Sequence, residues 1–151
     1  MALLILNERN ELFRTAENLE DASFLISNLD YYQSLNKVIN ISDQDFIDLK
    51  YDVKHFESYD GSSVTWKTNL PLLPQSISKE MLDNFIKGYI QQYDDFIGIK
   101  GTTGHPFLTK VLNAKQALQN IDTSVLTFPI ESTMGNYLKS NNINFVHYTQ
   151  I

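Results

Sequence analysis

The strongest hydrophobic pattern lies in the second half of the chain and predicts a pair of helices. After Ser78, apolar residues recur at steps of three and four, with charged and amide side chains between them. The Ser78 hydroxyl is suited to cap the start of this helix. A second amphipathic segment begins at Pro106, a residue favoured at the first helical position. The pattern therefore predicts helices over about 79–97 and 106–121, which we expect to form a long antiparallel pair.

Two apolar runs near the amino end predict paired strands. Residues 3–6 and 11–15 flank a polar segment of four residues, which fits a turn between two short strands. A further β-rich stretch covers 35–41. We expect these segments to contribute to a small antiparallel sheet.

Helical spacing and capping residues predict short helices in the same region. Apolar residues from 21 to 32 follow a helical period, and Asp21 or Ser23 is placed to cap its start. Ser42 precedes acidic residues that suit the first turn of a helix ending near Lys50, because the helix dipole favours negative charge there. We interpret those acidic residues as capping groups rather than catalytic ones.

The dipeptide Asp60-Gly61 predicts a β-hairpin, because a two-residue loop of type I′ requires positive φ at both central positions. The register that this loop sets brings Glu57 opposite Val64 and His55 opposite Trp66, the only tryptophan. We interpret His55 as a half-buried side chain packed on the indole rather than as a ligand-stacking group.

The rest of the chain completes an α+β pattern. Two prolines predict a stiff connector near 69–77, because proline lacks an N–H donor and holds the preceding residue extended. Beyond the helix pair we expect a β-rich segment at 125–128, a short helix over 131–139 and a final strand over 144–149. Together the elements predict an α+β fold, in which a small antiparallel sheet with hairpins packs with the long helix pair. With 151 residues and a mass of 17.4 kDa, we expect a single domain over 1–151.

The amino-acid composition excludes several classes of function. The chain has no cysteine, which excludes a disulfide framework, a thiolate zinc site and a thiol nucleophile. Twelve basic and eighteen acidic residues leave a net charge of −6, and the only arginines are Arg9 and Arg14, so nucleic acid is a poor partner. Apolar runs stay well short of the roughly 20 residues that span a bilayer, and the run after Met1 lacks a basic leader. We therefore expect no membrane partner, no signal-peptide secretion, and a location in the cytoplasm or in an intracellularly assembled particle.

Charge is distributed unevenly along the chain. Residues 1–97 carry a balance of −8, whereas 98–151 carry +2. Such asymmetry favours head-to-tail association between copies, unless folding interleaves the two halves or the acidic side chains form only a solvated surface.

The segment between the two long helices is a candidate binding loop. Its candidate residues are Lys100, Gly101, Thr102, Thr103 and Gly104, which precede a helix amino end where N–H groups can receive an anion or a partner. The loop matches neither a Walker loop nor the dinucleotide fingerprint, and its Gly-x-x-Gly units lack the flanks of a KH nucleic-acid module. A flexible turn between packed helices is the alternative.

One short pattern keeps an enzyme among the alternatives. His147-Tyr148-Thr149 fits the His-x-Thr unit of two-histidine phosphoesterases. Neither His55 nor His105 supplies the second unit, because neither is followed by a hydroxyl two residues on. The three histidines also lack metal-ligand spacing, so we expect no metal and no cofactor. A small phosphoesterase or nucleotide-binding domain that uses this unit and the glycine-rich loop is the alternative function.

The aromatic content favours protein–protein contacts. Aromatic residues make up 12 % of the chain, with eight tyrosines, which is typical of interfaces. Tyr31 and Tyr32 are candidate contact residues, although both would also suit the core. Without a set of catalytic residues, the sequence favours a non-catalytic structural or assembly protein, such as a virion component, with identical or different protein subunits as its partners. An inhibitor that covers a host enzyme is a further alternative, and it would also act through protein–protein contacts.

Overall fold

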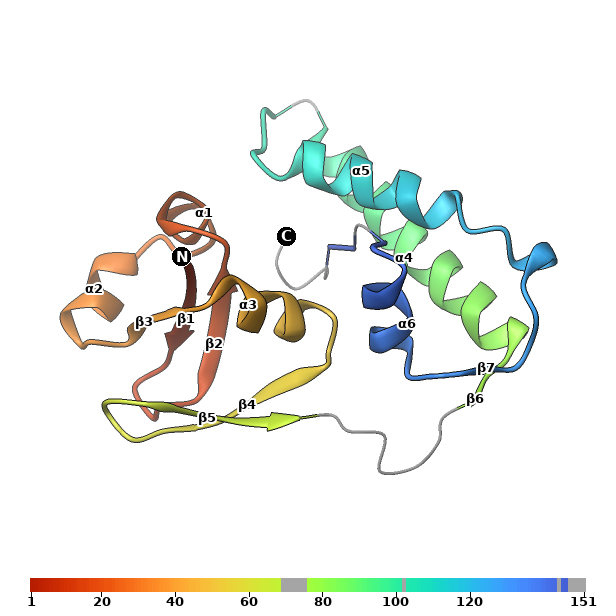
Figure 1. The fold of residues 1–151 in the computed structure, drawn as a ribbon. Helices are drawn as coiled ribbons and strands as arrows, with labels where there is room; N and C mark the ends of the chain where they lie inside the picture. The colour runs from red at the N-terminus through yellow and green to blue at the C-terminus, as the bar shows by residue number, and fades with distance from the viewer. Residues whose placement is uncertain (69–75, 102, 144, 147–151) are drawn as a thin grey trace. The chain divides into compact units, whose positions relative to one another are not determined.

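The computed structural model describes residues 1–68, 76–101, 103–143 and 145–146 (Figure 1). The chain divides into two compact units, the first over Met1–Leu70 and the second from Pro71 onward. The described residues contain helices and small antiparallel sheets, which confirms the α+β class. This division does not test the single domain expected over the whole chain, which stays a prediction.

A three-stranded antiparallel sheet forms the centre of the first unit, in the order β2-β1-β3. The central strand β1 (Ala2–Leu6) pairs with β2 (Leu12–Ala16) and with β3 (Val38–Ile41), and every residue of β1 is buried. An apolar run without polar alternation is what a strand covered on both faces requires. The strands predicted at 3–6 and 11–15 are confirmed, and the β-rich stretch 35–41 contains β3.

Helices and a hairpin cover the two faces of this sheet. Leu3 and Ile5 of β1 pack with residues of α1 and α2 on one face. Leu4 and Leu6 pack with residues of α3 and of the β4–β5 hairpin on the other face. The covering elements are α1 (Leu19–Leu25), α2 (Leu29–Ser34), α3 (Asp43–Lys50), β4 (Lys54–Tyr59) and β5 (Val64–Thr68).

The helix caps of the first unit are partly as predicted. Ser42 caps α3 by accepting a hydrogen bond from the backbone N–H of Asp45, and this helix ends at Lys50 as expected. The predicted caps of α1 are wrong, because the helix begins earlier and Asn18 accepts the N–H of Asp21 at 2.8 Å. The single helical period from 21 to 32 is divided between α1 and α2.

The hairpin at Asp60 is confirmed, but its predicted register is wrong. The Asp60 carboxylate accepts the backbone N–H groups of Ser62 and Ser63, each at 2.8 Å, which builds a longer loop than a two-residue turn. These bonds lower the pKa of Asp60 to about 2. Strand pairing consequently places Tyr59 opposite Val64.

The longer loop shifts the register by two residues, and a bulge between Phe56 and Ser58 reverses only one of them, so His55 does not face its predicted partner. Phe56 lies opposite Trp66, and His55 lies opposite Lys67. The His55 Nε2 atom instead lies 3.2 Å from Asp52 Oδ1. The proposed packing of His55 on the only tryptophan is therefore wrong.

The long helix pair forms the main body of the second unit (Figure 1). Helix α4 (Lys79–Lys100) is capped by Ser78, and α5 (Leu108–Gln119) follows after the intervening loop. Helix α4 runs three residues past the predicted end at 97, and α5 starts two residues after Pro106. Within the described ranges, none of the helices has the length and apolar character needed to cross a bilayer.

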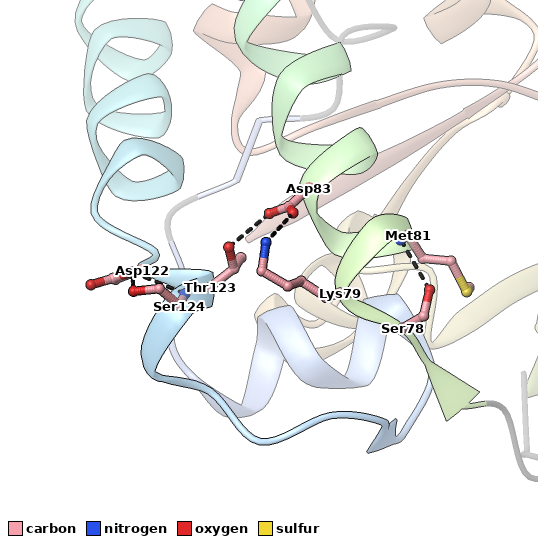
Figure 2. A network of polar contacts seen from close by, with 7 residues as sticks. All are labelled: Ser78, Lys79, Met81, Asp83, Asp122, Thr123 and Ser124. Atoms are coloured by element: carbon pink, nitrogen blue, oxygen red, sulfur yellow. Dashed lines mark hydrogen bonds and ion pairs between the residues drawn. The ribbon is translucent and has the colours of Figure 1, made fainter.

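Contacts near the two ends of the pair show that α4 and α5 are antiparallel. Asp94, late in α4, pairs with Lys115 of α5 at 2.5 Å. Asp83, early in α4, accepts the hydroxyl of Thr123 beyond α5 at 2.8 Å and the ammonium of Lys79 at 2.9 Å (Figure 2). Both hydrogen bonds lower the pKa of Asp83, with that from Lys79 the larger cause.

The segment after α5 forms a 3-10 turn where a β-rich stretch was predicted. Asp122 accepts hydrogen bonds from the backbone N–H of Ser124 at 3.0 Å and from its hydroxyl at 2.5 Å, which starts η1 (Thr123–Val125) (Figure 2). The prediction at 125–128 is wrong because these local bonds favour a turn over an extended strand. A short strand follows instead, β7 (Ile130–Glu131), paired with β6 (Ser76–Ile77).

The last described residues pack on α4. A short helix, α6 (Met134–Ser140), is capped by Thr133 and confirms the helix predicted at 131–139 apart from its start. The Phe145 ring lies 4.7 Å from that of Tyr89 and 5.7 Å from that of Phe85. The strand predicted over 144–149 falls mostly outside the described residues, and Phe145 and Val146 are not in a strand. Most of the predicted connector near 69–77 also falls outside them, while Ser76–Ile77 form β6.

Candidate interaction surface

The predicted contact residues Tyr31 and Tyr32 lie in α2 and form part of an aromatic cluster. The rings of Phe13 and Tyr32 are stacked, with centroids 5.3 Å apart and an interplanar angle of 24°. The rings of Tyr31 and Tyr32 meet edge to face at 5.4 Å. Offset and edge-to-face arrangements of this kind are the favourable ones for aromatic pairs. Sequence reasoning identified the two tyrosines but not Phe13.

A β-bulge brings Phe13 into this cluster. Strand pairing places Leu6 opposite Leu12 and Ile5 opposite Arg14, which leaves Phe13 without an opposing residue in β1. An extra residue in one strand bends that strand and redirects its side chain. Because Phe13 no longer follows the alternation of β2, a period-two reading of the sequence does not reveal its position.

The cluster is exposed on the surface of the first unit. Phe13 is 42 % exposed, Tyr31 is 43 % exposed, and Leu35 is 39 % exposed. Leu35 follows Tyr31 by one helical turn, and its N–H donates to the Tyr31 carbonyl. Tyr32 is half-buried and packs against the core cluster that Leu3 and Ile5 form with α1 and α2. We call Phe13, Tyr31, Tyr32 and Leu35 the aromatic surface.

Polar contacts hold the tyrosine and an acidic residue together at this surface. The Tyr31 hydroxyl donates to the Glu8 carboxylate, and this hydrogen bond is the main reason that the pKa of Tyr31 is raised. Glu8 belongs to the turn between β1 and β2, where Asn7 Oδ1 accepts the N–H groups of Arg9 at 2.9 Å and Glu11 at 3.0 Å. The turn and the helix are therefore joined through one charged hydrogen bond.

The predicted glycine-rich loop lies in the second unit, and its first residues are helical. Lys100 ends α4 and Gly101 is its C-cap. A Cβ at Gly101 would lie 2.4 Å from the carbonyl oxygen of Ile97, so this position accepts only glycine. Thr103 donates its N–H and its hydroxyl to the Lys100 carbonyl, and Gly104 has a φ of 69°. These contacts favour a turn that ends one helix, while Thr102 lies outside the described residues.

His105 has a structural role in this loop that sequence reasoning missed. Its Nδ1 atom accepts the backbone N–H of Phe107 at 3.1 Å, just before α5. The imidazole meets the Phe96 ring edge to face at 4.8 Å. Burial lowers the pKa of His105, and the positive charge of Lys100 lowers it further. The neutral imidazole is therefore the form that supports the turn, because only that form can accept a hydrogen bond.

We expect the His105→Asn variant to make stability less dependent on pH. The lowered pKa of His105 makes its contribution complete above about pH 6.5 and progressively lost as the pH falls below that value. Asparagine can accept an N–H two residues on without titrating. Urea unfolding, followed by helical circular dichroism between about pH 8 and pH 5, measures the difference. Equal loss of stability toward acid in both proteins would contradict this role.

The remaining sequence candidates are placed as follows. His147 and Thr149 lie outside the described residues, so the His-x-Thr unit stays a prediction. Among the described residues, no group of three or more histidine, aspartate or glutamate side chains is placed to hold a metal ion. Tyr31 and Tyr32 belong to one compact unit, and the glycine-rich loop belongs to the other.

No protein-family model, no curated protein and no solved structure matches this chain.

Proposed function

We propose that this chain is a non-catalytic structural or assembly protein that acts through protein–protein contacts, and that its specific role is as a component of a virus particle. The observation that supports the proposal is the aromatic surface, where Phe13, Tyr31 and Leu35 are exposed and the rings of Phe13 and Tyr31 both contact that of Tyr32. The free energy of the system falls when a partner removes exposed apolar side chains from water.

The geometry of the aromatic surface favours binding over simple exposure. The Tyr31 ring contacts Tyr32, which is itself stacked on Phe13, and the Tyr31 hydroxyl donates to Glu8. A side chain that is already ordered loses little conformational entropy when a partner packs on it. Tyrosine is also among the residues that contribute most to binding energy at interfaces.

The test uses a photoreactive phenylalanine analogue in place of Phe13. We expect irradiation of cells in which the protein is naturally made to yield adducts with specific protein partners. Mass spectrometry then identifies each partner as another copy of this chain or as a different protein. The same analogue at Val125, which is 75 % exposed in the second unit, is the matched control for non-specific labelling.

Adducts that form equally from positions 13 and 125 would contradict the proposal. So would a strict monomer at tens of micromolar together with no protein adduct from position 13. Either result would show that the aromatic surface is not a protein–protein interface.

A further inference from the structure

We infer that Asp60 is the site at which this chain forms isoaspartate, and that hydrogen bonds in the β4–β5 loop suppress the reaction while the chain is folded. The inference goes beyond the proposed function, because this loop shares no residue with the aromatic surface. It is carried by the Asp60-Gly61 sequence and by the contacts of the Asp60 carboxylate.

The sequence around Asp60 favours attack of the backbone on its side chain. Among all the aspartates and asparagines of the chain, only Asp60 is followed by glycine. A residue without a Cβ lets the backbone approach a neighbouring group closely. Gly61 is exposed, and outside the two adjacent residues a Cβ at this position would meet no atom within 4 Å. Water therefore has access to this peptide bond, and no other part of the protein blocks it.

The reaction is a ring closure followed by hydrolysis. The Gly61 nitrogen forms a bond to the side-chain carboxyl carbon of Asp60, and the N–H proton and the carboxyl hydroxyl leave together as water. A water molecule then adds to one of the two carbonyl carbons of the resulting succinimide, and the bond from that carbon to the nitrogen breaks. Opening at the backbone carbonyl gives isoaspartate, whereas opening at the side-chain carbonyl restores aspartate. The balance needs no reactant besides water.

The folded loop restrains both reacting groups. Asp60 Oδ1 accepts the backbone N–H groups of Ser62 and Ser63, each at 2.8 Å. The Ser62 hydroxyl donates to the same oxygen at 3.2 Å, and the Ser63 hydroxyl donates to Asp60 Oδ2 at 3.1 Å. On the other side of the peptide bond, the Tyr59 hydroxyl donates to the Gly61 carbonyl at 2.9 Å. Approach of the nitrogen to the carboxyl carbon therefore requires the loop to open.

The same hydrogen bonds hold Asp60 in its unreactive form. Ring closure releases the hydroxyl of the neutral acid, because an ionised carboxylate has no such leaving group. The backbone N–H groups of Ser63 and Ser62 stabilise the carboxylate and are the main reason that the pKa of Asp60 is lowered to about 2. In an unfolded chain the pKa of aspartate is about 3.9, so at equal pH the neutral acid is at least about tenfold rarer in the folded loop.

Conversion of Asp60 would in turn loosen the hairpin. Isoaspartate adds one carbon to the main chain and takes one from the side chain, so its carboxylate no longer lies where the serine donors point. Tyr59 and Val64 lie opposite each other beside the loop, and both pack against the core cluster that contains Leu4. The loop therefore protects the end of a hairpin that covers the central sheet of the first unit.

The test follows oxygen exchange at residue 60 in the whole chain. The protein is incubated in heavy-oxygen water, once folded and once unfolded in urea, at the same pH and temperature. Each opening of the succinimide adds one heavy oxygen at residue 60. Trypsin then releases residues 55–67, in which Asp60 is the only aspartate or asparagine. Mass spectrometry measures the label, and chromatography separates the isoaspartyl form. Asp60→Ser is the matched control, because serine can accept the loop N–H groups but has no carboxyl carbon.

We expect label and isoaspartate to accumulate in the unfolded wild type and not in Asp60→Ser. The folded wild type should acquire label at least about tenfold more slowly than the unfolded wild type. The variant Ser62→Ala with Ser63→Ala loses both hydroxyl donors and keeps both N–H donors, so its folded rate should lie between these two. Far-UV circular dichroism and Trp66 fluorescence check that the variants are folded.

Any of three results would overturn the inference. The first is an unfolded wild type that gains no label in residues 55–67. The second is a folded wild type that gains label as fast as the unfolded chain or faster, which would mean that the loop donors do not suppress ring closure. The third is a folded double serine variant that gains label as slowly as the folded wild type.

Discussion

The Leu4→Ala variant is expected to lower the free energy of unfolding of the first unit by about 2–5 kcal/mol. Leu4 lies in β1 with no exposed surface and packs in the core cluster formed with α3 and the β4–β5 hairpin. Truncation removes buried methyl groups and leaves a cavity that close-packed neighbours cannot fill. Urea unfolding followed by fluorescence of Trp66, which belongs to the same cluster, measures the loss.

Leu19→Ala is the matched control for this prediction. Leu19 begins α1 and is 54 % exposed, so the same chemical change should cost about 0.5 kcal/mol or less. Comparable losses in both variants would contradict the placement of β1 at the centre of the first unit.

The Tyr93→Phe variant is expected to destabilise the second unit by about 1–3 kcal/mol. The Tyr93 side chain is fully buried in α4, and its hydroxyl donates to the Val146 carbonyl while accepting the Val146 N–H at 3.1 Å. Val146 is itself buried. Loss of the hydroxyl removes one partner from each of two buried backbone groups, which is costlier than losing a bond that water can replace. Thermal unfolding and hydrogen exchange of the Val146 amide measure the effect.

Tyr59→Phe provides the comparison. The Tyr59 hydroxyl donates to the Gly61 carbonyl at 2.9 Å in an exposed loop, so its removal should cost about 0.5 kcal/mol or less. If Val146 exchanges at the same rate in the Tyr93→Phe variant as in the wild type, the hydroxyl does not hold the end of the described chain on α4.

Periodicity predicted the elements whose burial is simple. Helix α4 buries a single stripe that includes Leu82 and Tyr93, so its apolar residues recur at helical steps. β1 is buried on both faces and reads as one unbroken apolar run. In both cases the spacing of apolar residues is enough to predict the type of element, because the environment of the segment is uniform along its length.

Elements that depend on a particular side-chain bond or on a partner strand were not predictable in this way. Asp60 accepts two N–H groups and lengthens the hairpin loop, and together with a bulge between Phe56 and Ser58 this places Trp66 opposite Phe56. Asn18 caps α1 in place of the two residues proposed, although all three are suitable capping types. Several residues have a similar local preference for a cap or for a register position. Tertiary packing determines which of them is used.

The candidate site shows the same division. The tyrosine content of the chain pointed to Tyr31 and Tyr32, but Phe13 and Glu8 join them only through the fold. The position of Phe13 depends on a bulge relative to β1, and that of Glu8 depends on a turn that lies 23 residues before Tyr31. No spacing in the sequence expresses either relation.

Hydroxyl-radical footprinting of Phe13 and Tyr31 tests the central claim most directly. The comparison is between the purified chain at low concentration and the protein in the proposed assembly. The account predicts that both rings react readily in the dilute protein and become protected in the assembly, while exposed Val125 reacts alike in both. Equal reactivity of Phe13 and Tyr31 in the two states would contradict it.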